Sequence, residues 1–201
     1  MPLDIDVGEL AERGWTVVED FLPADVIAAL RAEAARFADE QRFKEAGVGR
    51  GSAQAVRETV RGDRIYWLDP ETLTPAQALY WEAIEAVRAA LNQGLFLSLV
   101  SFEAHYAIYP PGAYYKKHVD RFKSADERMI SSTLYLNADW HEEAGGQLRL
   151  YDEAGSQTDV LPRAGVFVLF RSDTVPHEVL PAHRERCSLT GWFRRRSLLP
   201  C

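Results

Sequence analysis

Cysteine is scarce in this 201-residue chain, and the two cysteines exclude several kinds of protein. Cys187 and the C-terminal Cys201 are too few for a disulfide-stabilised scaffold, and they lack the CxxC spacing of a structural zinc site. A protein of a reducing compartment has no need of disulfides. We therefore expect a cytoplasmic protein.

Long hydrophobic runs and an excess of positive charge are also missing. No stretch of about 18 apolar residues occurs. The first residues, MPLDIDVGELAERG, carry acidic groups where a secretion signal has a basic region. These features argue against membrane spans and export. The formal net charge is -7, so no overall basic field would attract nucleic acid. We expect neither a membrane nor a nucleic-acid partner.

The composition that remains is typical of a globular chain. Hydrophobic residues make up 47% and charged residues 26% of the sequence. The length fits one domain over residues 1–201, because domains average about 150 residues. We expect a monomer with a sizeable core.

The first part of the chain has helical periodicity. A short helix is expected near residues 5–13, ended by Gly14 and followed by a strand at 15–18. Pro23 is expected in the first turn of a longer helix that continues through residues 24–40.

A second long helix and a loop complete the segment 1–94, which we expect to support the rest. Thr74 and Pro75 are a typical cap and first-turn proline, and Gly94 would end the helix. Between the two long helices, residues 43–63 are rich in glycine, arginine and small polar residues. We expect an irregular mobile loop there, and a candidate lid.

From residue 95 to 196 the pattern changes to short β-branched and aromatic runs separated by turn residues. The runs are FLSLVSFEAHYAIY, MISSTLYLN, GQLRLYD, TDVLP, GVFVLF, VPHEVLP and CSLTGWFRR. Strands at such regular spacing favour a sandwich or jelly roll. The expected fold is α+β and mainly β, a cupin-like jelly roll with the N-terminal helices on one face.

A candidate metal site begins with His118 and Asp120, which are two residues apart. In extended structure such residues share one face of the strand. His177 offers a third ligand from the run VPHEVLP. Two imidazoles and one carboxylate are typical of non-haem Fe(II) oxygenases, because the set leaves coordination positions open. The short HxD motif alone is weak evidence.

Arg186 strengthens this hypothesis, since it follows His177 by nine residues and enters an apolar strand. A buried guanidinium needs a carboxylate partner, and a dicarboxylate co-substrate would provide one. Arg184 is the alternative, although its place in the turn PAHRER makes Arg186 the better candidate.

The chain resembles the 2-oxoglutarate and Fe(II)-dependent dioxygenases, and within them the prolyl 4-hydroxylases. The match is with bacterial relatives of the animal oxygen-sensing prolyl hydroxylases. It rests on HYAIYPPGAYYKKHVDRF, TLYLNADW, GGQLRLY and PHEVLPAHRERCSLTGWFRRR, and extends to RGDRIYWLD at 61–69. The resemblance implies a double-stranded β-helix that uses Fe(II), 2-oxoglutarate and O2, with ascorbate as an optional reductant. Its partner would be a protein carrying a target proline, for which bacterial relatives suggest elongation factor Tu.

The resemblance also implies roles for single residues. His118, Asp120 and His177 would bind the iron, and Arg186 with Tyr135 would hold the distal carboxylate of 2-oxoglutarate. Further residues that the resemblance places at the site are Tyr109 and Thr190 in the co-substrate pocket, and Tyr115, Trp192, Arg61, Asp63 and Arg128 on the substrate side. In this comparison Asp63 and Arg128 would form an ion pair that ties the loop to the barrel.

Three alternatives stay open. The same chemistry could act on a small molecule or a free amino acid, or the chain could be a catalytically silent metal-binding module. An alkylated nucleobase fits poorly with the acidic charge. His105, His141 and His183 are leftover histidines with ordinary packing or surface roles as the simpler interpretation.

Overall fold

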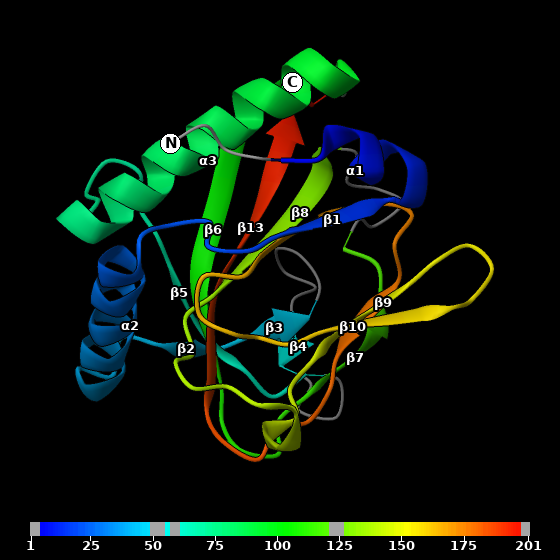
Figure 1. Ribbon diagram of the computed structural model, residues 1–201. Helices are drawn as coiled ribbons and strands as arrows, with labels where there is room; N and C mark the ends of the chain where they lie inside the picture. Colours follow the sequence, from blue (N-terminus) through cyan, green and yellow to red (C-terminus); the bar gives the residue numbers. More distant parts are fainter. Residues whose placement is uncertain (1–4, 49–54, 57–60, 121–126, 198–201) are drawn as a thin grey trace.

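The computed structural model describes residues 5–48, 55–56, 61–120 and 127–197 (Figure 1). Its three α-helices are α1 (Val7–Arg13), α2 (Ala24–Asp39) and α3 (Pro75–Leu95). Its strands are β1 (Trp15–Val18), β2 (Lys44–Glu45), β3 (Gly47–Val48), β4 (Ala55–Val56), β5 (Arg64–Trp67), β6 (Leu99–Tyr109), β7 (Tyr115–His118), β8 (Arg128–Tyr135), β9 (Leu148–Tyr151), β10 (Gln157–Val160), β11 (Phe167–Arg171), β12 (His177–Val179) and β13 (Arg186–Arg195). Within these described ranges, no helix is both long and apolar enough to cross a bilayer.

The helix boundaries follow local capping signals, with two corrections. Gly14 ends α1 in the left-handed conformation at φ 90°, as its lack of a side chain allows. Pro23 is the N-cap of α2, one position before the expected first turn. Thr74 caps α3 and Pro75 lies in its first turn, as the sequence indicated, and the structure adds a capping box with Gln77.

The expected stop of α3 at Gly94 is wrong. Gly94 lies inside the helix, and Phe96 caps it in a left-handed conformation at φ 54°. Gly94 is needed for packing, because an added Cβ would lie 2.6 Å from Cγ1 of Val7 in α1. Asn92 fixes the exit of the chain by donating to the Leu99 carbonyl and accepting from the Leu99 amide.

Eleven of the strands form two facing antiparallel sheets, the arrangement of a double-stranded β-helix, and β3 with β4 forms a separate two-stranded sheet. The larger sheet has the order β1-β11-β8-β13-β6-β5-β2, and the smaller has the order β10-β9-β12-β7. Strands distant in sequence lie side by side in both sheets (Figure 1). The seven strand runs recognised in the sequence correspond to β6 and β8 to β13, whereas β5 and β7 were not among them.

Alternation along the central strands divides the core in two. The outward face of the larger sheet packs against α2 and α3, with Leu30, Ile84 and Tyr106 among the fully buried residues. Figure 1 shows α3 crossing the ends of β6 and β13, with α2 farther along the same side of the molecule. The inward face packs against the smaller sheet through residues such as Tyr135 and Leu150. The candidate site residues come from both sheets, with His118 and His177 on the smaller sheet and Arg186 on the larger one.

The segment 43–63 is more regular than expected where it is described. β2 pairs with β5, and β3 pairs with β4. The end of the segment joins β7, since Arg61 forms a bridge with Tyr115 and the Gly62 amide donates to the Tyr114 carbonyl. Residues 49–54 and 57–60, the rest of the expected mobile loop, lie outside the described residues.

Candidate metal and co-substrate site

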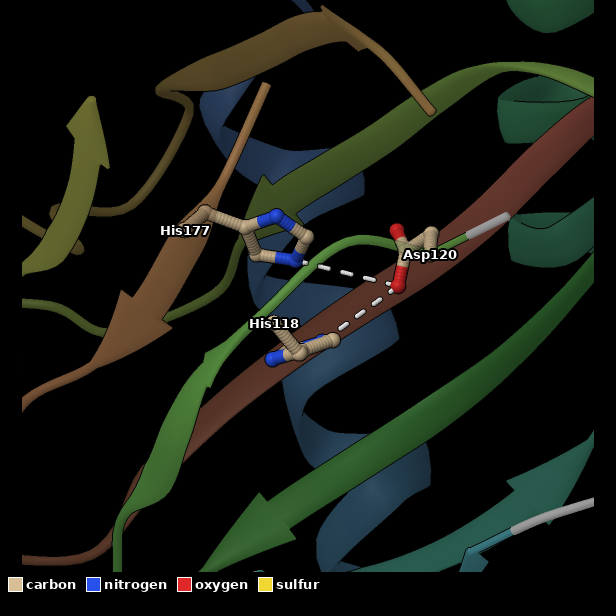
Figure 2. Close-up of side chains that lie close together, drawn as sticks. All are labelled: His118, Asp120 and His177. Carbon is tan, nitrogen blue, oxygen red and sulfur yellow. Dashed lines mark ion pairs between the residues drawn. The ribbon is translucent and has the colours of Figure 1, made fainter. Parts of the chain in front are cut away.

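Two neighbouring strands of the smaller sheet bring the histidines together. His177 on β12 is the direct partner of His118 on β7, and the two ring centroids are 4.3 Å apart. Asp120 lies two residues beyond His118, past the end of β7 rather than on the expected strand. Figure 2 shows its carboxylate pointing toward both imidazoles.

The candidate ligand atoms of these residues form one cluster. Asp120 Oδ1 lies 3.4 Å from His118 Nε2 and 3.7 Å from His177 Nε2. The ligand atoms of all three residues lie within 4.8 Å of one another. One metal ion can therefore contact all three.

Backbone carbonyls orient both imidazoles. Nδ1 of His118 is 2.7 Å from the Lys116 carbonyl, and Nδ1 of His177 is 3.2 Å from the Val175 carbonyl. A carbonyl only accepts, so Nδ1 is the donor in both contacts, and in a neutral imidazole the lone pair then lies on Nε2. His118 Nε2 is buried without a hydrogen-bond partner. An orphaned acceptor of this kind fits a divalent metal ion.

The protonation states also suit a metal. Burial lowers the pKa of His177 to about 4, so the ring is neutral at pH 7. Burial by itself would raise the pKa of Asp120, but His177, His118 and the Ser131 hydrogen bond outweigh it and hold the pKa below its ordinary range. Neutral imidazoles and an ionised carboxylate are the forms that bind Fe(II).

Arg186 lies on the inner face of the larger sheet at the start of β13 and is 2% exposed. Its Nε donates to the Gly146 carbonyl at 3.0 Å, and its guanidinium lies 5.1 Å from the Tyr109 ring and 4.9 Å from the Tyr135 ring. The Tyr135 hydroxyl is buried without a partner. A guanidinium and a free hydroxyl together fit a carboxylate.

Strand register explains why these residues share a face. Arg186 opposes Tyr109 on β6, and Thr190 opposes His105. Ser188 opposes Tyr135 on β8. Residues two apart along β13 point to the same side, so Arg186 and Thr190 both face inward. Arg184 lies elsewhere, exposed and donating to the Asp139 carbonyl, which favours Arg186 over it.

Trp192 connects the metal cluster to a wall of rings. Its Nε1 donates to Asp120 Oδ2 at 3.0 Å, and the Arg128 guanidinium lies 3.6 Å from its ring centroid. His105 lies between Trp192 and Trp67, with its pKa lowered to about 3 by burial. Trp67 is 45% exposed, so this wall of three rings, Trp192, His105 and Trp67, reaches the surface.

The predicted ion pair between Asp63 and Arg128 is wrong. Asp63 accepts from Arg61 Nε at 2.6 Å, and Arg128 pairs with Glu103 at 2.7 Å. The strand order separates the two residues, since Asp63 precedes β5 and Arg128 begins β8. Arg61 also lies 4.5 Å from the Tyr115 ring centroid.

Tyr115 connects the Arg61–Asp63 ion pair to the metal cluster. Its ring stacks on His118 at 3.7 Å between centroids.

Among the described residues, His105, His141 and His183 lie outside the candidate metal cluster. The sequence reasoning missed Ser131, which donates to Asp120, although its place four residues before Tyr135 on one strand face was a usable signal.

Comparison with known proteins agrees with this geometry. Residues 104–194 match the model of the 2OG-Fe(II) oxygenase superfamily. The crystal structure of a Pseudomonas putida prolyl-4-hydroxylase superposes with a TM-score of 0.87 at 50% identity, covering 95% of this chain and 97% of that one. The chain belongs to the 2OG-Fe(II) oxygenase superfamily and, within it, to the prolyl hydroxylases. Members of this family use Fe(II) as cofactor and 2-oxoglutarate and O2 as co-substrates.

Animal relatives are similar over nearly the whole chain. A prolyl hydroxylase from Trichoplax adhaerens, solved with a hypoxia inducible factor peptide, has a TM-score of 0.85 at 25% identity, covering 94% of this chain and 86% of that one. The hypoxia-inducible factor prolyl hydroxylase of Caenorhabditis elegans is 32% identical over 95% of this chain. Human Egl nine homolog 1 is 28% identical over 96%. The chain spans 28% of the worm protein's length and 46% of the human protein's length.

Proposed function

We propose that this chain is an Fe(II)- and 2-oxoglutarate-dependent dioxygenase that hydroxylates a prolyl residue of a protein, with release of succinate and CO2. The observation that carries the proposal is the common inner location of the His118–Asp120–His177 cluster and the buried Arg186. The Trichoplax relative was solved with a peptide of hypoxia inducible factor, which supports a protein substrate.

His118, Asp120 and His177 would bind the iron through the two Nε2 atoms and Oδ1. Bound iron, with O2 and the co-substrate, supplies the oxidising power for an unactivated carbon–hydrogen bond. The protein's own contribution is to orient the ligands and exclude water. The backbone carbonyls of Lys116 and Val175 orient the two imidazoles. The burial of His177 keeps water away from that ligand.

Arg186 and Tyr135 would hold the distal carboxylate of 2-oxoglutarate. The guanidinium supplies a charge-assisted hydrogen bond, and the Tyr135 hydroxyl supplies a second donor. Tyr109 and Thr190 would complete the co-substrate pocket, because they share the inner face with Arg186. No side chain needs to act as a general base in this reaction.

The substrate side would be formed by the wall at Trp192 and the stack at Tyr115. Arg128 lies over the Trp192 ring, and the ion pair of Arg61 with Asp63 supports Tyr115. Aromatic faces of this kind can pack against a proline ring, and guanidinium groups can donate hydrogen bonds to peptide carbonyls.

We propose a protein substrate of the translation apparatus, with elongation factor Tu as the first candidate. The cytoplasm is the proposed location, and a monomer the proposed active form. Ascorbate would serve as an accessory reductant. These points rest on the resemblance to bacterial prolyl hydroxylases and on the low cysteine content.

The decisive experiment is an anaerobic titration with Fe(II) and 2-oxoglutarate. A visible metal-to-ligand charge-transfer band is expected, followed by succinate release on admitting air. Peptides and intact elongation factor Tu are then added, and mass spectrometry locates a gain of one oxygen on proline.

The outcomes separate the alternatives. A band with succinate release but no prolyl oxidation in any protein would favour a small-molecule or amino-acid substrate. Metal binding without 2-oxoglutarate turnover would indicate a silent module and contradict the proposal.

A further inference from the structure

The two oxygens of the Asp120 carboxylate have different partners. Oδ1 faces the two imidazoles, at 3.4 and 3.7 Å from their Nε2 atoms. Oδ2 points away and accepts two hydrogen bonds, from the Ser131 hydroxyl at 2.6 Å and from Trp192 Nε1 at 3.0 Å. Only Oδ1 is therefore available to a metal.

A second serine extends this arrangement. Ser172 Oγ lies 2.8 Å from Ser131 Oγ. A metal-binding carboxylate carries no proton, so the Ser131 hydroxyl must donate to Asp120. Its oxygen is then the acceptor for the Ser172 hydroxyl. The hydrogen bonds run in one direction, from Ser172 through Ser131 to Asp120.

Both serines are held by the centre of the larger sheet. Ser131 lies on β8 between Phe170 of β11 and Trp192 of β13. Ser172 directly follows β11, and its amide donates to the Met129 carbonyl at 3.0 Å. Both residues are 0% exposed, so water does not compete for their hydroxyls.

We propose that Ser131 and Ser172 are positioning residues that hold Asp120 as a ligand through one oxygen. This inference rests on the proposed function. Carboxylates can bind a metal through one oxygen or both. With Oδ2 engaged by Ser131 and Trp192, the second mode is blocked, and positions stay open for a bidentate co-substrate and O2. Partners in this outer layer typically change metal affinity 10- to 100-fold.

The test measures Fe(II) affinity by anaerobic equilibrium titration, without turnover. Ser131→Ala is expected to weaken binding about tenfold or more, and Ser172→Ala by less, because it acts through Ser131. The double variant is expected to bind no more weakly than Ser131→Ala alone. Ser131→Thr, which keeps the hydroxyl, is expected to restore affinity.

Ser132→Ala is the matched control. Ser132 is the next residue on β8 and is equally buried, but its side chain points to the opposite face of the sheet. Its hydroxyl donates to the Gly191 carbonyl. Its removal is expected to leave Fe(II) affinity unchanged. Urea unfolding of each metal-free variant separates a general loss of stability from a specific loss of affinity.

Three results would overturn the inference: wild-type affinity in both Ser131→Ala and Ser172→Ala, strictly additive losses in the double variant, or an equal loss in Ser132→Ala. If Ser131→Ala does not fold, Ser172→Ala carries the test by itself. Failure of the unmodified protein to bind Fe(II) would instead contradict the proposed function.

Discussion

His177 and His118 are direct partners in an antiparallel ladder, although a long stretch of chain separates them in the sequence. Their Nδ1 atoms donate to the carbonyls two residues before each, so both Nε2 atoms are free to face Asp120. The backbone therefore sets the ring orientation before any metal binds.

Replacing His177 with Ala removes one of the three proposed ligands. We expect loss of the charge-transfer band and of 2-oxoglutarate decarboxylation, with the far-UV circular dichroism unchanged. His183→Ala is the control, since His183 is exposed and lies outside the cluster. Full decarboxylation by the His177 variant would refute the assignment.

Arg186→Ala should raise the apparent KM for 2-oxoglutarate far more than it weakens Fe(II) binding. A charge-assisted hydrogen bond contributes about 1.5–3 kcal/mol, which corresponds to roughly a 10- to 100-fold change. Arg184→Ala, at an exposed arginine, should leave the KM unchanged. Steady-state succinate assays measure the KM of both variants. A raised KM in Arg184→Ala with an unchanged KM in Arg186→Ala would transfer the role to Arg184.

Arg61→Ala leaves the Asp63 carboxylate buried without its partner, because that side chain is 0% exposed. We expect a loss of about 3–5 kcal/mol in the free energy of unfolding. Urea denaturation measures it, with the exposed Arg64→Ala as control. The double variant Arg61→Ala/Asp63→Ala should lose less than the single variant, and additive losses would contradict this interpretation.

The same pair predicts a functional effect. Arg61 supports Tyr115, which stacks on His118. We expect Arg61→Ala to reduce hydroxylation of a protein substrate more than it reduces 2-oxoglutarate turnover without substrate. An equal reduction of both would place the effect at the metal rather than on the substrate side.

His105 should make the fold sensitive to acid. Burial lowers its pKa from 6.5 to about 3, so between these values the unfolded chain binds more protons than the folded chain. The contribution of neutral His105 to stability is therefore fully present above pH 6.5 and is lost as the pH drops toward 3, by at most about 1.4 kcal/mol per pH unit. His105→Gln should flatten this decline between pH 6.5 and 4 in urea unfolding of the metal-free protein. An unchanged slope would contradict the prediction.

Local patterns determined the helices and most strands. The capping box at Thr74 and the left-handed Gly14 act within one helical turn, so they can be recognised from neighbouring residues. The short apolar runs likewise predicted β6 and β8 to β13. β7 was missed because its residues YKKH alternate poorly and depend on β12 for pairing.

The family motifs determined which residues to consider, since the HxD spacing, His177 and Arg186 are all visible in the sequence. Only the tertiary structure decided their partners. Asp63 pairs with Arg61 rather than Arg128, because strand order places Glu103 beside Arg128.

The use of the two Asp120 oxygens was also invisible in the sequence. It depends on Ser131 and Ser172, which come from β8 and the end of β11 and meet only when these strands pair. Hydrogen bonds require atoms within about 3 Å. Contacts at that range between distant segments are set by strand register and packing, which no local pattern encodes.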